Sequence, residues 1–275
     1  MNLQDKLAQL KEILSRMGSV LVAYSGGVDS SFLAAVAHEV LADRSMAVFA
    51  YSPVAPPAEK EEAASLAQSL ELRFLSIESH EMDNPSFVAN PVDRCYYCKS
   101  ELFTTLKALA EREGLAWVAD GSNSDDLADY RPGRKACAEA KVRSPLLEAG
   151  LTKSEIRELS REMGLPTWDR PASPCLASRI PYGTPVTKPL LDQIFEGEKF
   201  LRSLGFRQVR LRHHGEIARI EVDEVDMPRL LADDTRREIV RKIKELGFKY
   251  VALDLTGYRT GSLNMVISGR AQENL

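Results

Sequence analysis

The sequence lacks any long apolar run and any strong excess of charge of one sign. A membrane-spanning helix needs about 18 or more apolar residues in a row, and no stretch of this chain approaches that length. The formal net charge is −4 over 275 residues, which gives no overall attraction to nucleic acid or to a membrane surface. Residues 3–16 have the periodicity of an amphipathic, charged helix rather than the composition of a signal peptide. These absences predict a cytoplasmic protein.

Several catalytic and nucleotide-binding signatures are also missing. The chain has no HExxH motif, no serine nucleophile elbow, no GxxxxGK[ST] loop and no GxGxxG fingerprint. No glutamine amidotransferase domain is recognisable, which argues against a glutamine-dependent synthetase. Cysteine is scarce, with four in the chain. In a cytoplasmic protein, cysteines are expected to be thiols, metal ligands or catalysts rather than structural disulfides.

Strand-like and helical segments alternate in the first part of the chain. The predicted strands are residues 20–24, 47–51, 74–77 and 117–120, and the predicted helices are residues 29–41, 58–70 and 98–112. This alternation predicts an α/β fold with a parallel sheet that helices cover on both faces. Ligands of such sheets bind beyond the carboxyl ends of the strands. Here those ends are followed by the segments SGG, SPV, and DGSN, and by the NPVDRC loop.

The second part of the chain has a different pattern. Six prolines fall within residues 166–189 and predict a loop at a domain boundary. Beyond it, the predicted elements are a helix (190–204), two strands (208–213 and 217–222), a helix (235–246) and a strand (250–253). We therefore expect an α/β domain over residues 1–170, a cysteine-bearing linker loop over 171–187 and a small α+β domain for substrate binding or oligomerisation over 188–275.

The segment SGGVDSS, residues 25–31, lies between the first strand and the first helix of the sheet. Glycines let the backbone approach a ligand closely and adopt positive φ. The free amides and the dipole of a helix N-terminus favour an anion, and the serines add hydroxyl donors. The segment predicts a phosphate cradle, and the alternative is a plain glycine turn with a serine or aspartate cap.

SGGVDSS resembles the pyrophosphate-loop (PP-loop) signature of the ATP pyrophosphatases, which adenylate a substrate and release pyrophosphate. The resemblance implies that residues 1–170 form a PP-loop domain that binds ATP. It also implies that Asp29 helps to hold magnesium, which prefers carboxylate and phosphate oxygens. The remaining phosphate-binding residues implied by the resemblance are Ser25, Gly26, Gly27, Ser30 and Ser31.

Four further segments, DRCYYCKSELF, DGSNSDDLADYRPGRKA, RSPL and SPCLASRIPYGTPVT, resemble the LarE family in the same order over nearly the whole chain. LarE-family proteins are ATP-dependent sulfur transferases of nickel-pincer nucleotide cofactor synthesis. The resemblance implies that a carboxylate of pyridinium-3,5-biscarboxylic acid mononucleotide is adenylated and converted to a thiocarboxylate. It also implies a small-molecule nucleotide substrate, a homo-oligomer and, for some members, a separate sulfur donor.

Cys175 matches the sulfur-transferring cysteine of that family. It lies in a proline-rich loop that also contains Ser178 and Arg179, and a nearby cation favours the nucleophilic thiolate form. From the residues alone, the alternative is a buried structural cysteine.

Cys95 and Cys98 form a CxxC pair, which alone fits a redox pair, half of a zinc site or two unrelated thiols. The hypothesis we favour is a [4Fe–4S] cluster held by Cys95, Cys98 and Cys175, with one iron open. Family members with three cysteines follow this pattern. Two alternatives remain: a four-cysteine zinc site that includes Cys137, and the use of Cys175 as a sacrificial sulfur donor that becomes dehydroalanine. Cys137 itself lies in a helical-looking segment and is expected to be an ordinary residue.

Further ligand contacts are predicted from strand ends and family motifs. For the nucleotide and substrate they are Tyr51, Ser52, Asp120, Gly121, Ser122 and Arg143. Arg210 and Arg212 lie on one face of a predicted strand, where paired guanidinium groups suit the phosphate of the substrate; a solvated basic face is the alternative. Glu198 is a further candidate for a metal or substrate site. Asp129, Tyr130 and Arg131 complete the family pattern without an assigned role.

Two other functions stay open at this point. A tRNA thiolase would share the same loop, but it needs an RNA-binding surface that the acidic chain does not indicate. A nucleotide-binding or zinc-binding regulatory module would bind ligand without turnover.

Overall fold

The computed structural model describes residues 2–55, 58–127, 132–171 and 174–259. By its contacts the chain divides into two units, the first formed by residues 1–87 and 93–173 and the second by residues 88–92 and 174–275. The division thus lies at residue 173, and no feature of the sequence indicates that residues 88–92 join the second unit.

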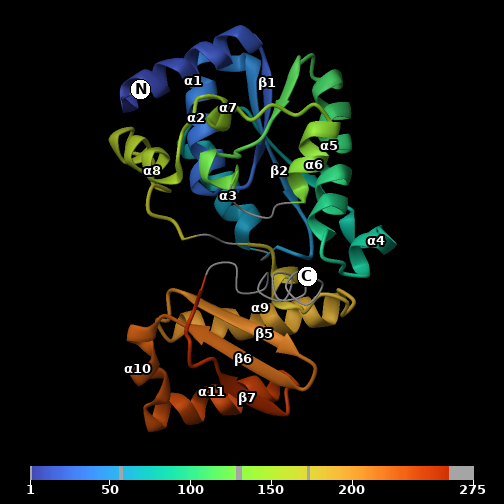
Figure 1. Ribbon diagram of the computed structural model, residues 1–275, viewed down its shortest axis with the longest axis vertical. Coiled ribbons are helices and arrows are strands. Elements are labelled where there is room, and N and C mark those ends of the chain that lie inside the picture. The colour runs from blue at the N-terminus through green and yellow to red at the C-terminus, as the bar shows by residue number, and fades with distance from the viewer. Residues whose placement is uncertain (1, 56–57, 128–131, 172–173, 260–275) are drawn as a thin grey trace, which may run out of the picture. The chain divides into compact units, whose positions relative to one another are not determined.

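A four-stranded parallel sheet forms the centre of the first unit (Figure 1). Its strands are β1 (Val20–Tyr24), β2 (Ser45–Tyr51), β3 (Phe74–Glu78) and β4 (Trp117–Ala119). They lie in the order β3-β2-β1-β4. The chain therefore moves outward from β1 to β3 and then returns to the other side of β1. The carboxyl ends of β1 and β4 meet at this reversal, which is where open α/β sheets bind ligands.

Helices cover both faces of this sheet, as predicted. They are α1 (Leu3–Met17), α2 (Val28–Leu41), α3 (Ala58–Ser69), α4 (Pro85–Val88), α5 (Arg94–Arg112), α6 (Gly133–Glu139), α7 (Pro145–Glu148) and α8 (Lys153–Glu162), with short 3-10 turns η1 (Ala42–Arg44), η2 (Glu81–Asp83) and η3 (Ser124–Leu127). Successive strand residues point to opposite faces. Val20 and Val22 join the core beneath α1 and α2, whereas Leu21 joins the core beneath α5 and α6 (Figure 1).

A three-stranded sheet forms the second unit, with β5 (Val209–His214) antiparallel to β6 (Ile217–Val222), and β6 parallel to β7 (Tyr250–Leu253). The other elements are η4 (Leu176–Arg179), α9 (Lys188–Ser203), η5 (Glu224–Asp226), α10 (Met227–Leu231) and α11 (Asp233–Glu245). Residues 88–92 belong here because Asn90 is fully buried and its side-chain amide donates to the carbonyls of Pro181 and Thr184, both at 2.8 Å. No helix within the described ranges is long and apolar enough to cross a membrane.

Candidate functional site

The glycine-rich loop connects β1 to α2 and is braced by its own serines. The Ser25 and Ser30 hydroxyls lie 3.0 Å apart, and the Ser25 amide donates to the Ser30 hydroxyl at 3.1 Å. Gly26 has φ 70°, in the left-handed region that favours glycine. Gly27 caps α2 without a side-chain bond to the first-turn amides, which leaves them to an anionic ligand. The loop therefore has the backbone geometry of the predicted phosphate cradle.

The end of β4 packs directly against this cradle. A Cβ atom at Gly121 would lie 3.1 Å from the Ser30 amide nitrogen, so the close approach of the two segments requires glycine. Residues 120–123 and the loop at 25–31, which are far apart in sequence, are thereby brought together at the reversal of the sheet. This juxtaposition fits a nucleotide, because both segments offer polar groups at the carboxyl edge.

Asp120 is buried and organises the neighbourhood of this edge. Its carboxylate accepts hydrogen bonds from the Ser122 and Ser144 hydroxyls, each at 2.7 Å, and from the Cys137 thiol at 3.3 Å. Burial, together with the Asp120 carboxylate, raises the pKa of the Cys137 thiol to about 12. Cys137 is therefore a neutral thiol that supports Asp120.

Asp29, the predicted magnesium ligand, has a partner for each carboxylate oxygen. The Asn123 side-chain amide donates to Oδ1 at 3.3 Å, and the Lys153 ammonium forms an ion pair with Oδ2. Arg170 reaches the same loop, where it donates to the Gly26 carbonyl at 3.2 Å and pairs with Glu62. Sequence reasoning missed Lys153 and Arg170, because a single cation in a helix or loop carries no motif of its own.

A surface depression adjoins Arg170. It lies between α3 and the segment that follows α8, and it is lined by Glu61, Glu62, Ser65, Leu66, Pro166, Thr167, Asp169, Arg170 and Pro171. Since Arg170 also contacts Gly26, the depression borders the phosphate cradle within the first unit.

Three other predicted contacts of the first unit have their own partners. The Lys60 ammonium lies 3.7 Å from the centre of the Tyr51 ring, and the Ser52 hydroxyl donates to buried Glu81. Both Tyr51 and Ser52 follow the prediction in lying at the carboxyl end of β2. Arg143 instead contacts Glu148 and the Trp117 ring, and Trp117 begins β4. The structure therefore does not bring the guanidinium group of Arg143 to the glycine-rich loop.

Cys95 and Cys98 lie in the first turns of α5, which begins at Arg94 rather than at residue 98 as predicted. Residues three apart share a helix face, so the two thiols can serve one ligand. Cys95 is exposed and Cys98 is half-buried. Among the residues that the structure describes, no three His, Cys, Asp or Glu side chains gather as a metal-binding group.

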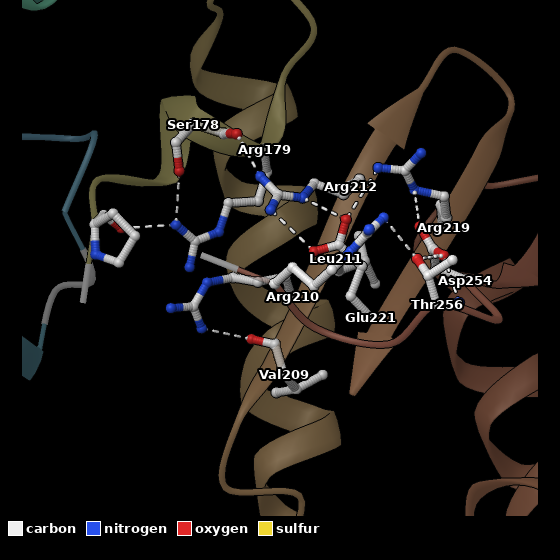
Figure 2. Close-up of polar contacts among 12 residues, drawn as sticks. Ser178, Arg179, Val209, Arg210, Leu211, Arg212, Arg219, Glu221, Asp254 and Thr256 are labelled. Atoms are coloured by element: carbon white, nitrogen blue, oxygen red, sulfur yellow. Dashed lines mark hydrogen bonds and ion pairs between the residues drawn. The ribbon is translucent and has the colours of Figure 1, made fainter. Parts of the chain in front are cut away.

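In the second unit, Arg179 braces the loop that carries Cys175 (Figure 2). Its guanidinium group is buried and donates to the carbonyl oxygens of Pro174, at 2.7 Å, and Cys175, at 3.2 Å, and to the Ser178 hydroxyl at 2.9 Å. Cys175 is half-buried just before η4. The contacts of Arg179 that the structure gives here are to the backbone of the cysteine, so its evident role is to fix the loop.

Glu198 is the acidic partner of Arg179. The two side chains are joined by two hydrogen bonds, at 2.7 and 3.0 Å, and Glu198 also accepts from the Leu211 amide at 3.1 Å and from Arg202 at 2.6 Å. Burial acts to raise the pKa of Glu198, but the neighbouring guanidinium groups lower it below its ordinary value. With four donors on two oxygens, these contacts favour a structural role over the predicted metal role.

Arg210 and Arg212 lie on the same face of β5, as the alternation predicts, but both are buried. The alternative of a solvated basic strand face is therefore wrong. Arg212 pairs with Glu221 at 2.9 and 3.0 Å and donates to the Ser178 carbonyl at 2.8 Å (Figure 2). Arg210 donates to the Val209 carbonyl at 2.8 Å, and burial lowers its pKa. The arginines thus lie in one cluster with the cysteine loop.

Asp129, Tyr130 and Arg131 lie outside the described residues. The roles suggested by the family pattern therefore have no structural account.

Comparison with known proteins places this arrangement. The family model described as NAD synthase matches residues 3–89, which include the glycine-rich loop. An uncharacterized protein of Synechocystis sp. is 44% identical over 266 residues, or 97% of this chain and 99% of that one. The pyridinium-3,5-bisthiocarboxylic acid mononucleotide synthase of Lactiplantibacillus plantarum is 40% identical over 263 residues, or 95% of each chain. The chain belongs to the LarE family.

The LarE-family assignment confirms the resemblance predicted from the sequence motifs. More distant similarity extends to a glutamine-hydrolyzing GMP synthase of Archaeoglobus fulgidus, one chain of which is 28% identical over 170 residues, or 57% of this chain and 55% of that one. The LarE-family relatives match nearly end to end, so the second unit with Cys175 is part of what they share with this chain.

Proposed function

We propose that this protein is an ATP-dependent sulfur transferase that converts a carboxylate of pyridinium-3,5-biscarboxylic acid mononucleotide to a thiocarboxylate. The observation that carries the proposal is the 40% identity to the Lactiplantibacillus plantarum synthase over 95% of both chains. The phosphate cradle at residues 25–31 and the braced loop of Cys175 support it, since the two parts of the reaction need an ATP site and a sulfur nucleophile.

In the first part of the reaction, a carboxylate oxygen of the substrate attacks the α-phosphorus of ATP and pyrophosphate leaves. The loop amides and serine hydroxyls bind phosphate oxygens and stabilise the charge that develops there. Magnesium bound at Asp29 would supply further positive charge to those oxygens. The residues fit that ion, because Asp29 lies at the cradle and has an oxygen that is now neutralised by a lysine.

In the second part, the Cys175 thiolate attacks the acyl carbon and AMP leaves, which gives a thioester. Removal of the Cα proton of Cys175 with breakage of its Cβ–Sγ bond then leaves a thiocarboxylate on the substrate and dehydroalanine in the chain. Arg179 holds the backbone of the loop through this sequence. Arg210 and Arg212 are the proposed contacts for the substrate phosphate, because the buried cluster holds more arginines than carboxylates.

A [4Fe–4S] cluster held by Cys95, Cys98 and Cys175 is the second candidate source of sulfur. The spacing of Cys95 and Cys98 on one face of α5 fits two cluster ligands, and Cys175 would supply the third from the second unit. Such a cluster would offer a sulfide at its open iron. Refilling it would call for a sulfur donor, whereas the sacrificial route consumes Cys175 once.

The test is to incubate the anaerobically purified protein with ATP, magnesium and the dicarboxylate nucleotide, and to measure pyrophosphate and the mass of the product. Pyrophosphate with exchange of oxygen for sulfur in the product supports the function. Its absence with this substrate, alongside salt-dependent RNA binding, would favour a tRNA thiolase.

The source of the sulfur is measured on the same preparation. About four irons per chain, as a [4Fe–4S] cluster requires, that are lost in Cys95→Ala, Cys98→Ala and Cys175→Ala would identify the cluster. Loss of one hydrogen sulfide from Cys175 in an iron-free protein would identify the sacrificial route.

A further inference from the structure

The carboxylate of Asp29 is held from two directions in the first unit. The Asn123 amide, beyond the end of β4, donates to Oδ1 at 3.3 Å. The ammonium of Lys153, the first residue of α8, forms an ion pair with Oδ2. A divalent cation that binds Asp29 has to compete with one of these donors, and Lys153 is the one that carries a like charge.

The backbone of Lys153 is anchored, whereas its side chain has room to move. Thr152 and Glu155 form a capping box at the start of α8, and the Lys153 amide donates to the Asp125 carboxylate at 2.9 Å. The Lys153 side chain remains 34% exposed. A lysine is a compact charge on a flexible four-carbon stem, so it can change partners without displacing the helix.

The position of this ammonium suits an anion beside the loop. Lys153 is held to the first turn of α2 through Asp29, and that turn supplies the free amides of the cradle. When a magnesium ion neutralises Asp29, the ammonium loses its carboxylate partner, and the nearby phosphates offer new acceptors for it.

We propose that Lys153 is a nucleotide-binding residue that exchanges partners. It neutralises Asp29 in the free protein and transfers to a phosphate oxygen of ATP when magnesium takes Asp29. The inference rests on the proposed use of ATP and assigns a residue to it. It makes two separate demands: loss of the ammonium weakens nucleotide binding, and it strengthens metal binding to the protein without nucleotide.

The experiment compares Lys153→Met with Lys6→Met. Lys6 is a matched control because it forms an ion pair with Glu155 of the same helix, with 17% of its side chain exposed, and has no contact with the loop among its described bonds. Titration calorimetry measures the affinity for magnesium with a non-hydrolysable ATP analogue. The electron paramagnetic resonance of Mn²⁺ measures metal binding to the nucleotide-free protein.

For Lys153→Met we expect nucleotide affinity to fall by about tenfold or more, the scale of one hydrogen bond to a charged group, and Mn²⁺ binding without nucleotide to tighten. Lys6→Met should change neither, and Lys153→Arg should retain part of the nucleotide affinity. Unchanged nucleotide affinity or unchanged Mn²⁺ binding in Lys153→Met would overturn the inference. If the wild-type protein itself did not bind the analogue, the proposed function would fail instead. Mn²⁺ binding to the free variant still tests the Asp29 pair if Lys153→Met is less stable.

Discussion

The thiol of Cys137 is buried beside the carboxylate of Asp120, and its pKa of about 12 lies above the ordinary value of 9.0. An unfolded chain releases this proton near pH 9, whereas the folded protein keeps it until about pH 12. The thiol therefore contributes fully to stability below pH 9, and this contribution is lost as the pH rises toward 12. We expect Cys137→Ala to lose less stability than the wild type between about pH 9 and pH 11, as measured by urea unfolding. The exposed Cys95→Ala is the control, and equal pH slopes in Cys137→Ala and wild type would contradict the assignment.

Glu198 tests whether a buried ion pair holds the loop of Cys175. Its side chain has no exposed surface, and removal leaves the Arg179 guanidinium buried without its carboxylate. Breaking such a pair costs about 3–5 kcal/mol, so Glu198→Ala should lower the free energy of unfolding by that amount. Glu196→Ala on the same helix removes an exposed pair with Lys199 and should cost less than about 1 kcal/mol. Similar urea midpoints for the two variants would mean that solvent reaches the cluster.

At the scale of elements, α9 approaches the small sheet through a glycine. A Cβ atom at Gly197 would lie 2.7 Å from Cδ1 of Leu211 and 3.4 Å from Cδ1 of Ile243, and both side chains are fully buried. Alanine improves helix propensity by about 1 kcal/mol, but overpacking a core costs about 1–3 kcal/mol. Gly197→Ala should therefore be destabilising in urea unfolding. Stabilisation by the full helix propensity would show that α9 has room to move away from β5.

The elements were predictable where they depend on local pattern. The apolar runs of β1 and β2 and the glycine-rich loop between β1 and α2 need no knowledge of distant residues, and they lie within a few residues of their predicted positions. The pairing of Arg179 with Glu198, of Lys153 with Asp29, and the position of Asn90 depend on contacts between segments distant in sequence. Burial of Arg210 had no sequence signal either, because strand alternation places two arginines on one face without saying what covers it.

At the scale of the whole molecule, the proposed reaction is divided between the two units. The phosphate cradle and Asp29 belong to the first unit, and Cys175 and Arg179 belong to the second. Each unit has a sheet of its own, so a substitution in one need not damage the other. Adenylation uses only groups of the first unit, whereas sulfur transfer requires the thiol of the second to reach the acyl carbon.

This division predicts that the two parts of the reaction can be separated by substitution. Cys175→Ser should keep substrate-dependent exchange of labelled pyrophosphate into ATP, because reversible adenylation needs no thiol, but it should form no thiocarboxylate. Asp29→Asn should lose both activities, because the adenylate is the precursor of the thioester and the amide is a poorer magnesium ligand than the carboxylate. Exchange and product mass are measured on the same samples, with thermal unfolding to show that each variant is folded. Loss of exchange in folded Cys175→Ser would mean that the second unit takes part in adenylation, and the division of labour between the units would then be wrong.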